Sequence, residues 1–256
     1  MELNLSVFLI VCPLVFLAGF VDSIAGGGGL ISLPAYLLAG IPVHIAMGTN
    51  KLSSTMGAIT ASCRYYRNGF VDMFLCAPSI IAALAGSALG TSLTLLVNER
   101  YLQWLLVAVL PVTAFFVLRK KELQASGTVF SRPKTALIAA LASFVMGAYD
   151  GFFGPGTGTF LILLYCGLAR IEARTAAGNA KLVNLASNIS AAALFFVHGK
   201  TLLPLALAAG AFSIAGSYLG SGLVIKKGAG VIRLFILAVL GLLLIRVVLN
   251  NFNIWN

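Results

Sequence analysis

The sequence predicts an all-α, polytopic membrane protein, and two observations support this fold class. Of the 256 residues, 60% are hydrophobic and 9% are charged, whereas soluble domains are roughly half apolar and a quarter charged. The mean hydropathy is +1.01, and apolar runs near the roughly 20 residues that cross a bilayer as a helix recur along the chain. Lipid-facing strands would alternate apolar and polar residues, so the spans are expected to be helices.

We expect eight to ten membrane segments. Two of them, at 29–43 and 157–169, are short and follow glycine-rich breaks, so broken or re-entrant helices fit as well as full crossings. The expected segments cover about 5–21, 29–43, 51–63, 70–97, 102–118, 134–149, 157–169, 182–197, 201–225 and 231–249.

Three motifs occur twice and divide the chain into two related halves. The matched pairs are GFVDSIAGGGG (19–29) with GAYDGFFGPGT (147–157), GTNKL (48–52) with GNAKL (178–182), and AGSALG (85–90) with AGSYLG (215–220). Asp22 falls on Asp150 with a shift of 128 residues, and the other two pairs share a shift of 130. We therefore predict a first transmembrane repeat at 1–118 and a second at 135–256, joined by a basic linker at 119–134.

The basic residues orient these halves, because cytoplasmic loops carry the excess of Lys and Arg. If the linker is cytoplasmic and each half has five segments, counting a re-entrant hairpin as two, most of the 17 basic residues lie inside, Lys181 among them. The exceptions are Lys51, Arg100, Lys200 and Arg246. An odd number of segments per half implies inverted halves and two extracytoplasmic termini, whereas a parallel repeat would place one basic loop outside.

Each half contains a glycine-rich break, AGGGGLISLP at 25–34 and GPGTGTFL at 154–161, that opens an apolar helix. Free N–H groups and the helix dipole favour an anion there, and matched breaks in two halves point to a transporter site. Close helix packing through small residues is the alternative, and no Gly-Lys-Ser/Thr follows that would indicate a nucleotide site. The candidate substrate-binding residues here are Gly26, Gly27, Gly28, Gly29, Gly154, Gly156 and Thr157.

A second pair of polar clusters is expected to open two further helices: Thr49, Asn50 and Lys51 in the first half, and Asn179 and Lys181 in the second. Amide donors and a lysine suit an anion with several oxygens, and ionisable groups near hydrocarbon indicate function. Alternatively, Thr49 or Asn50 caps its helix and the lysine extends to the membrane surface. Side chains one or two turns deeper that could line the same path are Ser53, Ser54, Asn184 and Asn188.

Asp22 and Asp150 occupy equivalent positions in the two halves. Each could cap a half-helix, pair with Lys51 or Lys181, or bind a coupling proton. Two membrane aspartates also raise the possibility of an intramembrane aspartyl protease, but the Gly-x-Gly-Asp partner of the Tyr149-Asp150 motif is missing. We therefore expect no catalytic residue.

The remaining polar and basic residues point to no cofactor or macromolecular partner. The two histidines and four cysteines have no metal-ligand spacing, so no metal or cofactor is expected. The net charge of +10 reports membrane topology and not nucleic-acid binding.

The motifs GFVDSIAGGGGLISLPAYLLAGIP and GTNKL, with their second-half versions GAYDGFFGPGTGTF and GNAKL, resemble the TauE/SafE group of sulfite and organosulfonate exporters, also called the toluene sulfonate uptake permease family. The resemblance covers essentially the whole chain. It implies an inner-membrane permease for sulfur-containing anions, most often an exporter. The second half departs from the first at Asn179-Ala180 and at Pro155, so the two half-sites are not chemically identical.

We therefore expect a permease for sulfite or sulfonates that exports by alternating access, with an anion channel or, less favoured, a membrane-embedded enzyme as alternatives. The expected partners are a small anion and the lipid bilayer of the inner membrane. The sequence leaves the oligomeric state open, with a homodimer as one option.

Overall fold

The computed structural model describes residues 4–102 and 130–227. The predicted segment at 231–249, all but the first residue of the segment at 102–118, most of the linker and both termini lie outside the described residues. The described part is a bundle of helices: α1 (Leu5–Ala25), α2 (Gly29–Leu38), α3 (Val43–Arg67), α4 (Met73–Leu96), α6 (Arg132–Phe152), α7 (Thr157–Gly167), α8 (Ala173–Val197) and α9 (Leu203–Lys227).

Five of these helices, α1, α4, α6, α8 and α9, are long and apolar enough to cross a membrane. They expose large apolar side chains outward, such as Leu9, Leu93 and Leu141, as lipid-facing helices do. The helices α2 and α7 have 10 and 11 residues and reach only about half of the roughly 30 Å hydrocarbon layer. Each packs against the long helix before it, and we call the two units the α1–α2 and α6–α7 hairpins. Of the two alternatives that the glycine-rich breaks left open, helices this short fit a broken or re-entrant segment better than a full crossing.

The helix α3 is 25 residues long but too polar to count among the apolar spans. The prediction that Thr49 and Asn179 open their helices is wrong, because α3 begins at Val43 and α8 at Ala173, about two turns earlier. The polar clusters lie within continuous helices, where they interrupt only the run of apolar residues. The helix continues because several of their side chains have polar partners inside the bundle. The dipole of a helix N-terminus therefore does not act at Lys51 or Lys181.

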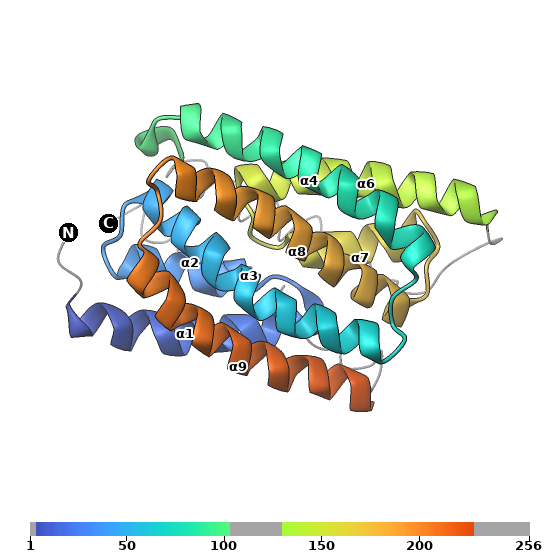
Figure 1. Ribbon diagram of the computed structural model, residues 1–256, viewed down its shortest axis with the longest axis horizontal. Coiled ribbons are helices and arrows are strands. Elements are labelled where there is room, and N and C mark those ends of the chain that lie inside the picture. The colour runs from blue at the N-terminus through green and yellow to red at the C-terminus, as the bar shows by residue number, and fades with distance from the viewer. Residues whose placement is uncertain (1–3, 103–129, 228–256) are drawn as a thin grey trace, which may run out of the picture.

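The helices of the two halves correspond in order and length. Shifting α3 by 130 residues gives the bounds of α8, and α1, α2 and α4 fall on α6, α7 and α9 to within a residue or two. The helices α3 and α8 run in opposite directions: Gly48 near the start of α3 lies against Phe195 near the end of α8, while Gly178 near the start of α8 lies against Phe70 beyond the end of α3. Figure 1 shows α3 and α8 crossing the centre in opposite directions.

The two halves are interlocked, because the fourth helix of each packs along the first helix of the other. The pairs are α4 with α6 and α1 with α9. The repeated AGSxLG motif makes both contacts: Gly90 lies against the backbone of Ala148, and its counterpart Gly220 lies against the backbone of Phe20. Small residues let membrane helices approach this closely, so this motif joins the two halves.

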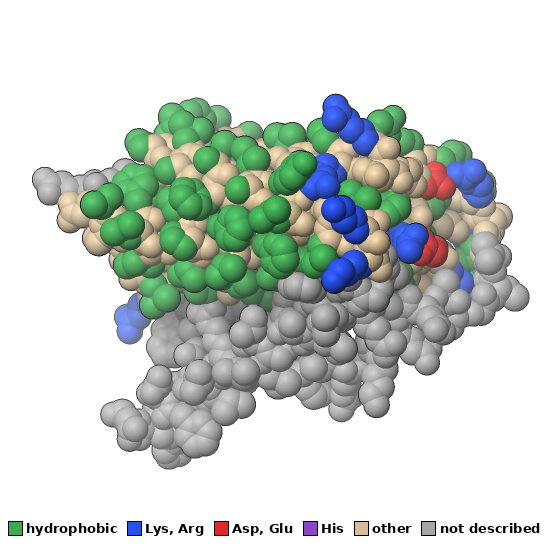
Figure 2. Space-filling view, turned by 90° about the horizontal axis from the view of Figure 1, so that it is seen from below, with side chains coloured by type: hydrophobic (Ala, Val, Ile, Leu, Met, Phe, Trp, Pro, Cys, Tyr) green, Lys and Arg blue, Asp and Glu red, His purple; other side chains and the backbone are tan. Residues whose placement is uncertain are grey.

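Basic side chains gather toward the end of the molecule where α3 ends and α8 begins (Figure 2). Several stack on aromatic rings there: the guanidinium of Arg64 lies 4.1 Å from the ring centre of Tyr218, and that of Arg132 lies 5.0 Å from the ring centre of Phe74. Lys181, which the charge count placed at this end, is instead buried in the bundle.

Candidate functional site

The two glycine-rich breaks meet at the centre of the bundle. Gly26 has φ +71°, and a Cβ at this position would overlap the carbonyl carbon of Gly158 in the other hairpin. The hydroxyl of Thr159 donates a hydrogen bond of 3.0 Å to the carbonyl of Ala25. Both the backbone conformation and the contact require glycine at residue 26, so the tip of the α1–α2 hairpin can touch the α6–α7 hairpin only with this residue.

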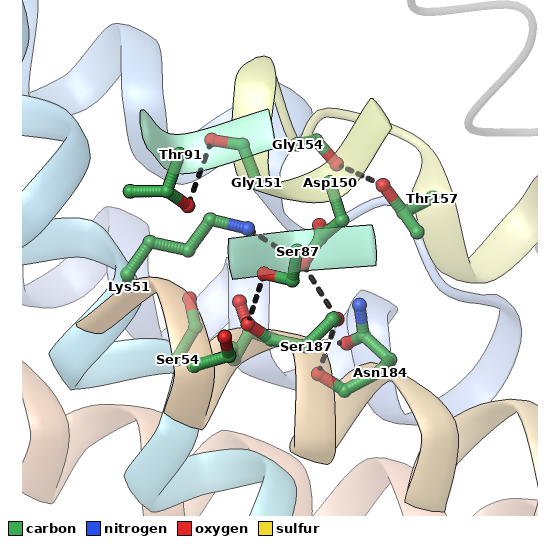
Figure 3. Close-up of polar contacts among 12 residues, drawn as sticks. Lys51, Ser54, Ser87, Thr91, Asp150, Gly151, Gly154, Thr157, Asn184 and Ser187 are labelled. Atoms are coloured by element: carbon green, nitrogen blue, oxygen red, sulfur yellow. Dashed lines mark hydrogen bonds and ion pairs between the residues drawn. The ribbon is translucent and has the colours of Figure 1, made fainter. Parts of the chain in front are cut away.

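Lys51 of α3 reaches across to Asp150 of α6. Its Nζ lies 2.7 Å from Oδ2 of Asp150, and the two side chains are 4% and 3% exposed. The Ser187 hydroxyl of α8 donates a 2.6 Å hydrogen bond to the same carboxylate oxygen. The break gives the ammonium room, because a Cβ on Gly154 would lie 3.2 Å from Nζ. Three helices and one hairpin tip thus hold this ion pair (Figure 3).

Lys181 and Asp22 form the matching ion pair, in which the second half supplies the lysine and the first half the aspartate. The Lys181 Nζ lies 2.5 Å from Oδ2 of Asp22 and also donates to the Asp22 carbonyl at 2.7 Å. The other carboxylate oxygen accepts the backbone N–H of Gly28 at 3.2 Å. The Asp22 side chain is 22% exposed, so this pair is less enclosed than the first. In both pairs the lysine comes from one half and the aspartate from the other.

A small cavity of about 30 Å³ adjoins the Lys51–Asp150 pair. It holds on the order of two water-sized spheres, so a larger anion enters only if the hairpins or helices move apart. Its lining consists of Asp22, Gly27, Gly29, Asn50, Lys51, Ser54, Asp150, Gly154, Gly156, Thr157, Gly158, Asn184 and Asn188.

The amides beside this cavity are held in place by their own helices. The Oδ1 of Asn184 accepts a 3.1 Å hydrogen bond from Nδ2 of Asn188, and Oδ1 of Asn50 accepts one of 3.5 Å from the Ser54 hydroxyl. Within the described part of the chain, Nδ2 of Asn50 and of Asn184 has no hydrogen-bond partner, although Asn50 is 9% exposed and Asn184 is 5% exposed. Their N–H groups are therefore available to a bound group.

The structure brings most of the predicted binding residues to this cavity, including Gly27, Gly29, Asn50 and Lys51 from the first half. Gly26 and Lys181 line a second, smaller cavity beside Asp22. Thr49 and Asn179 lie apart from both and hold loops of the other half: the Thr49 hydroxyl accepts the N–H of Leu202 at 3.0 Å, and Oδ1 of Asn179 accepts the N–H of Asp72 at 3.0 Å.

Ser187 contacts Asp150 directly and was not among the candidates from the sequence. A signal for this face of α8 does exist. Lys181, Asn184 and Asn188 recur at spacings of three and four residues along the chain, which places them on one side of a helix. Ser187 follows Asn184 by three residues, and its hydroxyl oxygen also lies 3.0 Å from the Asn184 carbonyl oxygen.

The arrangement presents cationic and amide donors to a narrow space whose lining includes the acidic side chains Asp22 and Asp150. The four charged groups of the two pairs sum to zero, so the site is neutral before a ligand enters. An anion can bind here only by sharing or replacing a carboxylate at a lysine. Such a site suits reversible anion binding coupled to movement between the halves.

Comparison with known proteins agrees with this architecture. Residues 11–247 match the family described as sulfite exporter TauE/SafE. The chain is 35% identical over 237 residues to a probable membrane transporter protein of Haemophilus influenzae, covering 91% of each chain. It is 34% identical over 226 residues to the probable membrane transporter protein YfcA of Escherichia coli, covering 87% of this chain and 82% of that one.

A more distant relative, the probable membrane transporter protein YdhB of Bacillus subtilis, is 24% identical over 221 residues, covering 84% of this chain and 88% of that one. No solved structure matches the fold significantly. The family match covers nearly the whole described bundle, and the first two relatives exceed 30% identity over most of their own length. The chain is a multi-pass membrane protein that belongs to the TauE/SafE sulfite exporter family, a family of transporters and not of enzymes.

Proposed function

We propose that this protein is a carrier that exports small sulfur-containing anions, such as sulfite or sulfonates, by alternating access. The observation that carries the proposal is the pair of reciprocal Lys–Asp contacts, Lys51 with Asp150 and Lys181 with Asp22, which join the halves where the two glycine-rich breaks meet. A buried lysine beside free amide donors supplies the charge and the hydrogen bonds that an oxyanion needs. The name of the matching family supports the choice of a sulfur oxyanion.

The proposal treats residues 1–118 and 135–256 as inverted repeats joined by the basic linker at 119–134. The reversed direction of α3 and α8 and the matching helix lengths support the inversion. In carriers built from inverted repeats, the substrate lies at the repeat interface, and rocking of one body against the other exposes it to each side in turn. The narrow cavity then corresponds to an occluded arrangement.

The gathering of basic residues at the end where α3 ends supports placing that end in the cytoplasm. Both termini are then extracytoplasmic, in the inner membrane. An anion leaving a negatively charged interior gains about 2.3 kcal/mol per charge per 100 mV. Export on this scheme needs no coupling ion.

Flux measurements in proteoliposomes test the proposal. Radiolabelled sulfite should enter vesicles that contain unlabelled sulfite by saturable counterflow. Lys51→Ala should reduce this counterflow at least tenfold, and Arg100→Ala, which changes an exposed arginine far from the cavity lining, should leave it within twofold of the wild type. Flux that does not saturate and shows no counterflow would indicate an anion channel. Equal effects of the two variants would refute the site.

A further inference from the structure

The surroundings of the two equivalent ion pairs differ chemically. Lys51 corresponds to Lys181 under the shift of 130 residues, but its neighbour Asn50 corresponds to Ala180. The cavity at Lys51 is lined by glycines and by polar or charged side chains, with no aliphatic or aromatic side chain among its described lining. The cavity at Lys181 is instead lined in part by Ile24, Ile162 and Ala177. The Lys51 side therefore offers the more hydrophilic environment of the two.

The two lysines also differ in how many of their donors are already used. Each ammonium has three N–H donors. Lys181 donates to both the carbonyl and the carboxylate of Asp22, whose second oxygen is held by a backbone N–H. Lys51 has one acceptor, Asp150, within residues 4–102 and 130–227. Lys51 therefore keeps two N–H donors without a protein partner among the described residues, whereas Lys181 keeps one.

The amides complete the difference between the two sides. Asn50 and Asn184 line the Lys51 cavity, and the Nδ2 group of each has no hydrogen-bond partner among the described residues. The counterpart of Asn184 in the first half is Ser54, whose hydroxyl is already used to hold Asn50. Amide N–H groups without a protein partner can donate to a bound oxyanion.

We infer that the two half-sites have divided roles: the Lys51 side binds one small oxyanion, with Asn50 and Asn184 as its amide ligands, and the Lys181–Asp22 pair is a fixed contact between the halves. This inference rests on the proposed function and names the ligand positions within it. Oxygen atoms on every side of the ligand would match a lining of glycines and polar or charged side chains. An aryl group would meet no apolar wall, so aromatic sulfonates should be excluded.

Binding titrations on the purified full-length chain in detergent test the inference, with sulfite as the probe. The double variant Asn50→Ala/Asn184→Ser replaces each amide by the residue at the equivalent position of the other half, Ala180 and Ser54. This variant should bind sulfite at least tenfold more weakly. The matched control Ala180→Ser adds a hydroxyl beside Lys181 and should leave the affinity within twofold. In a competition experiment, p-toluenesulfonate should displace no bound labelled sulfite at concentrations where unlabelled sulfite displaces all of it.

The outcomes separate this inference from the proposed function. A wild-type chain that binds no sulfite refutes both. Sulfite binding that the double variant leaves unchanged, or that Ala180→Ser weakens equally, refutes the division of roles and leaves the carrier intact. Displacement by p-toluenesulfonate at equal concentration refutes the small-oxyanion assignment. If the double variant does not fold, the single Asn50→Ala, which loses only the contact with Ser54, should still weaken binding at least threefold.

Discussion

Lys51 and Asp150 come from different halves of the chain, and their side-chain charges lie 2.7 Å apart in the interior of the bundle. Such a pair contributes little net stability relative to apolar residues, because desolvating both charges offsets their attraction. Its more distinctive property is that neither charge can move away alone without leaving the other buried and unpaired. The pair thereby couples the position of α3 to that of α6.

Removing Lys51 alone should destabilise the protein strongly. Lys51→Met leaves the Asp150 carboxylate, 3% exposed, without its cation, which costs about 3–5 kcal/mol in buried pairs. We expect a clear fall in melting temperature, measured by tryptophan fluorescence in detergent. The double variant Lys51→Met/Asp150→Leu should regain most of the stability without regaining sulfite counterflow.

The equivalent change on the other side provides the comparison. Lys181→Met should cost less, because Asp22 is 22% exposed and keeps the N–H of Gly28. A melting temperature for Lys51→Met at or above that of Lys181→Met would contradict the difference in burial.

Labelling of equivalent loop positions should distinguish inverted from parallel repeats. Asn68 follows α3, and His198 occupies the equivalent position after α8. In a cysteine-free background, Asn68→Cys should react with a membrane-impermeant maleimide only from the cytoplasmic side, and His198→Cys only from outside. Reaction of both positions from the same side would establish a parallel arrangement.

Gly26→Ala should reduce both stability and transport, because the change combines a strained φ with overlap against the other hairpin. Gly40→Ala is the matched control: Gly40 has φ +77° and open space around it, so it reports the backbone strain alone, about 1 kcal/mol. The loss of thermal stability in Gly26→Ala should be at least twice as large. Equal losses would mean that the hairpins separate easily.

Thr49→Val should affect folding more than binding. The Thr49 hydroxyl accepts the N–H of Leu202 at the start of α9, and losing this acceptor at a partly buried loop costs about 1 kcal/mol. Sulfite affinity by titration should stay within twofold of the wild type. A large fall in affinity with an unchanged melting temperature would instead show that Thr49 contributes to the binding site.

The sequence was most informative where it repeats. The matched motifs, with Asp22 on Asp150 and Gly26 on Gly154, locate the helix breaks that meet at the centre. The sequence could not reveal which lysine pairs with which aspartate, because two symmetric pairings satisfy the same charges and only the packing of the halves selects between them. The sequence also misplaces the starts of α3 and α8. Polar residues in the middle of a buried helix look like a helix boundary when the residues that pair with them are distant in the chain.

The packing of α1 along α9 bears on how the protein is made. Residues 26–202 are synthesised between the two helices. The side of α1 that receives Gly216 and Gly220, at Phe16 and Phe20, therefore stays in the bilayer without its partner until α9 has been made. The α4–α6 contact, between helices separated by residues 97–131, can form much earlier. Assembly in the membrane should therefore proceed from the middle of the sequence outward, and a ribosome-bound chain truncated before α9 should leave α1 open to lipids or to an insertion chaperone.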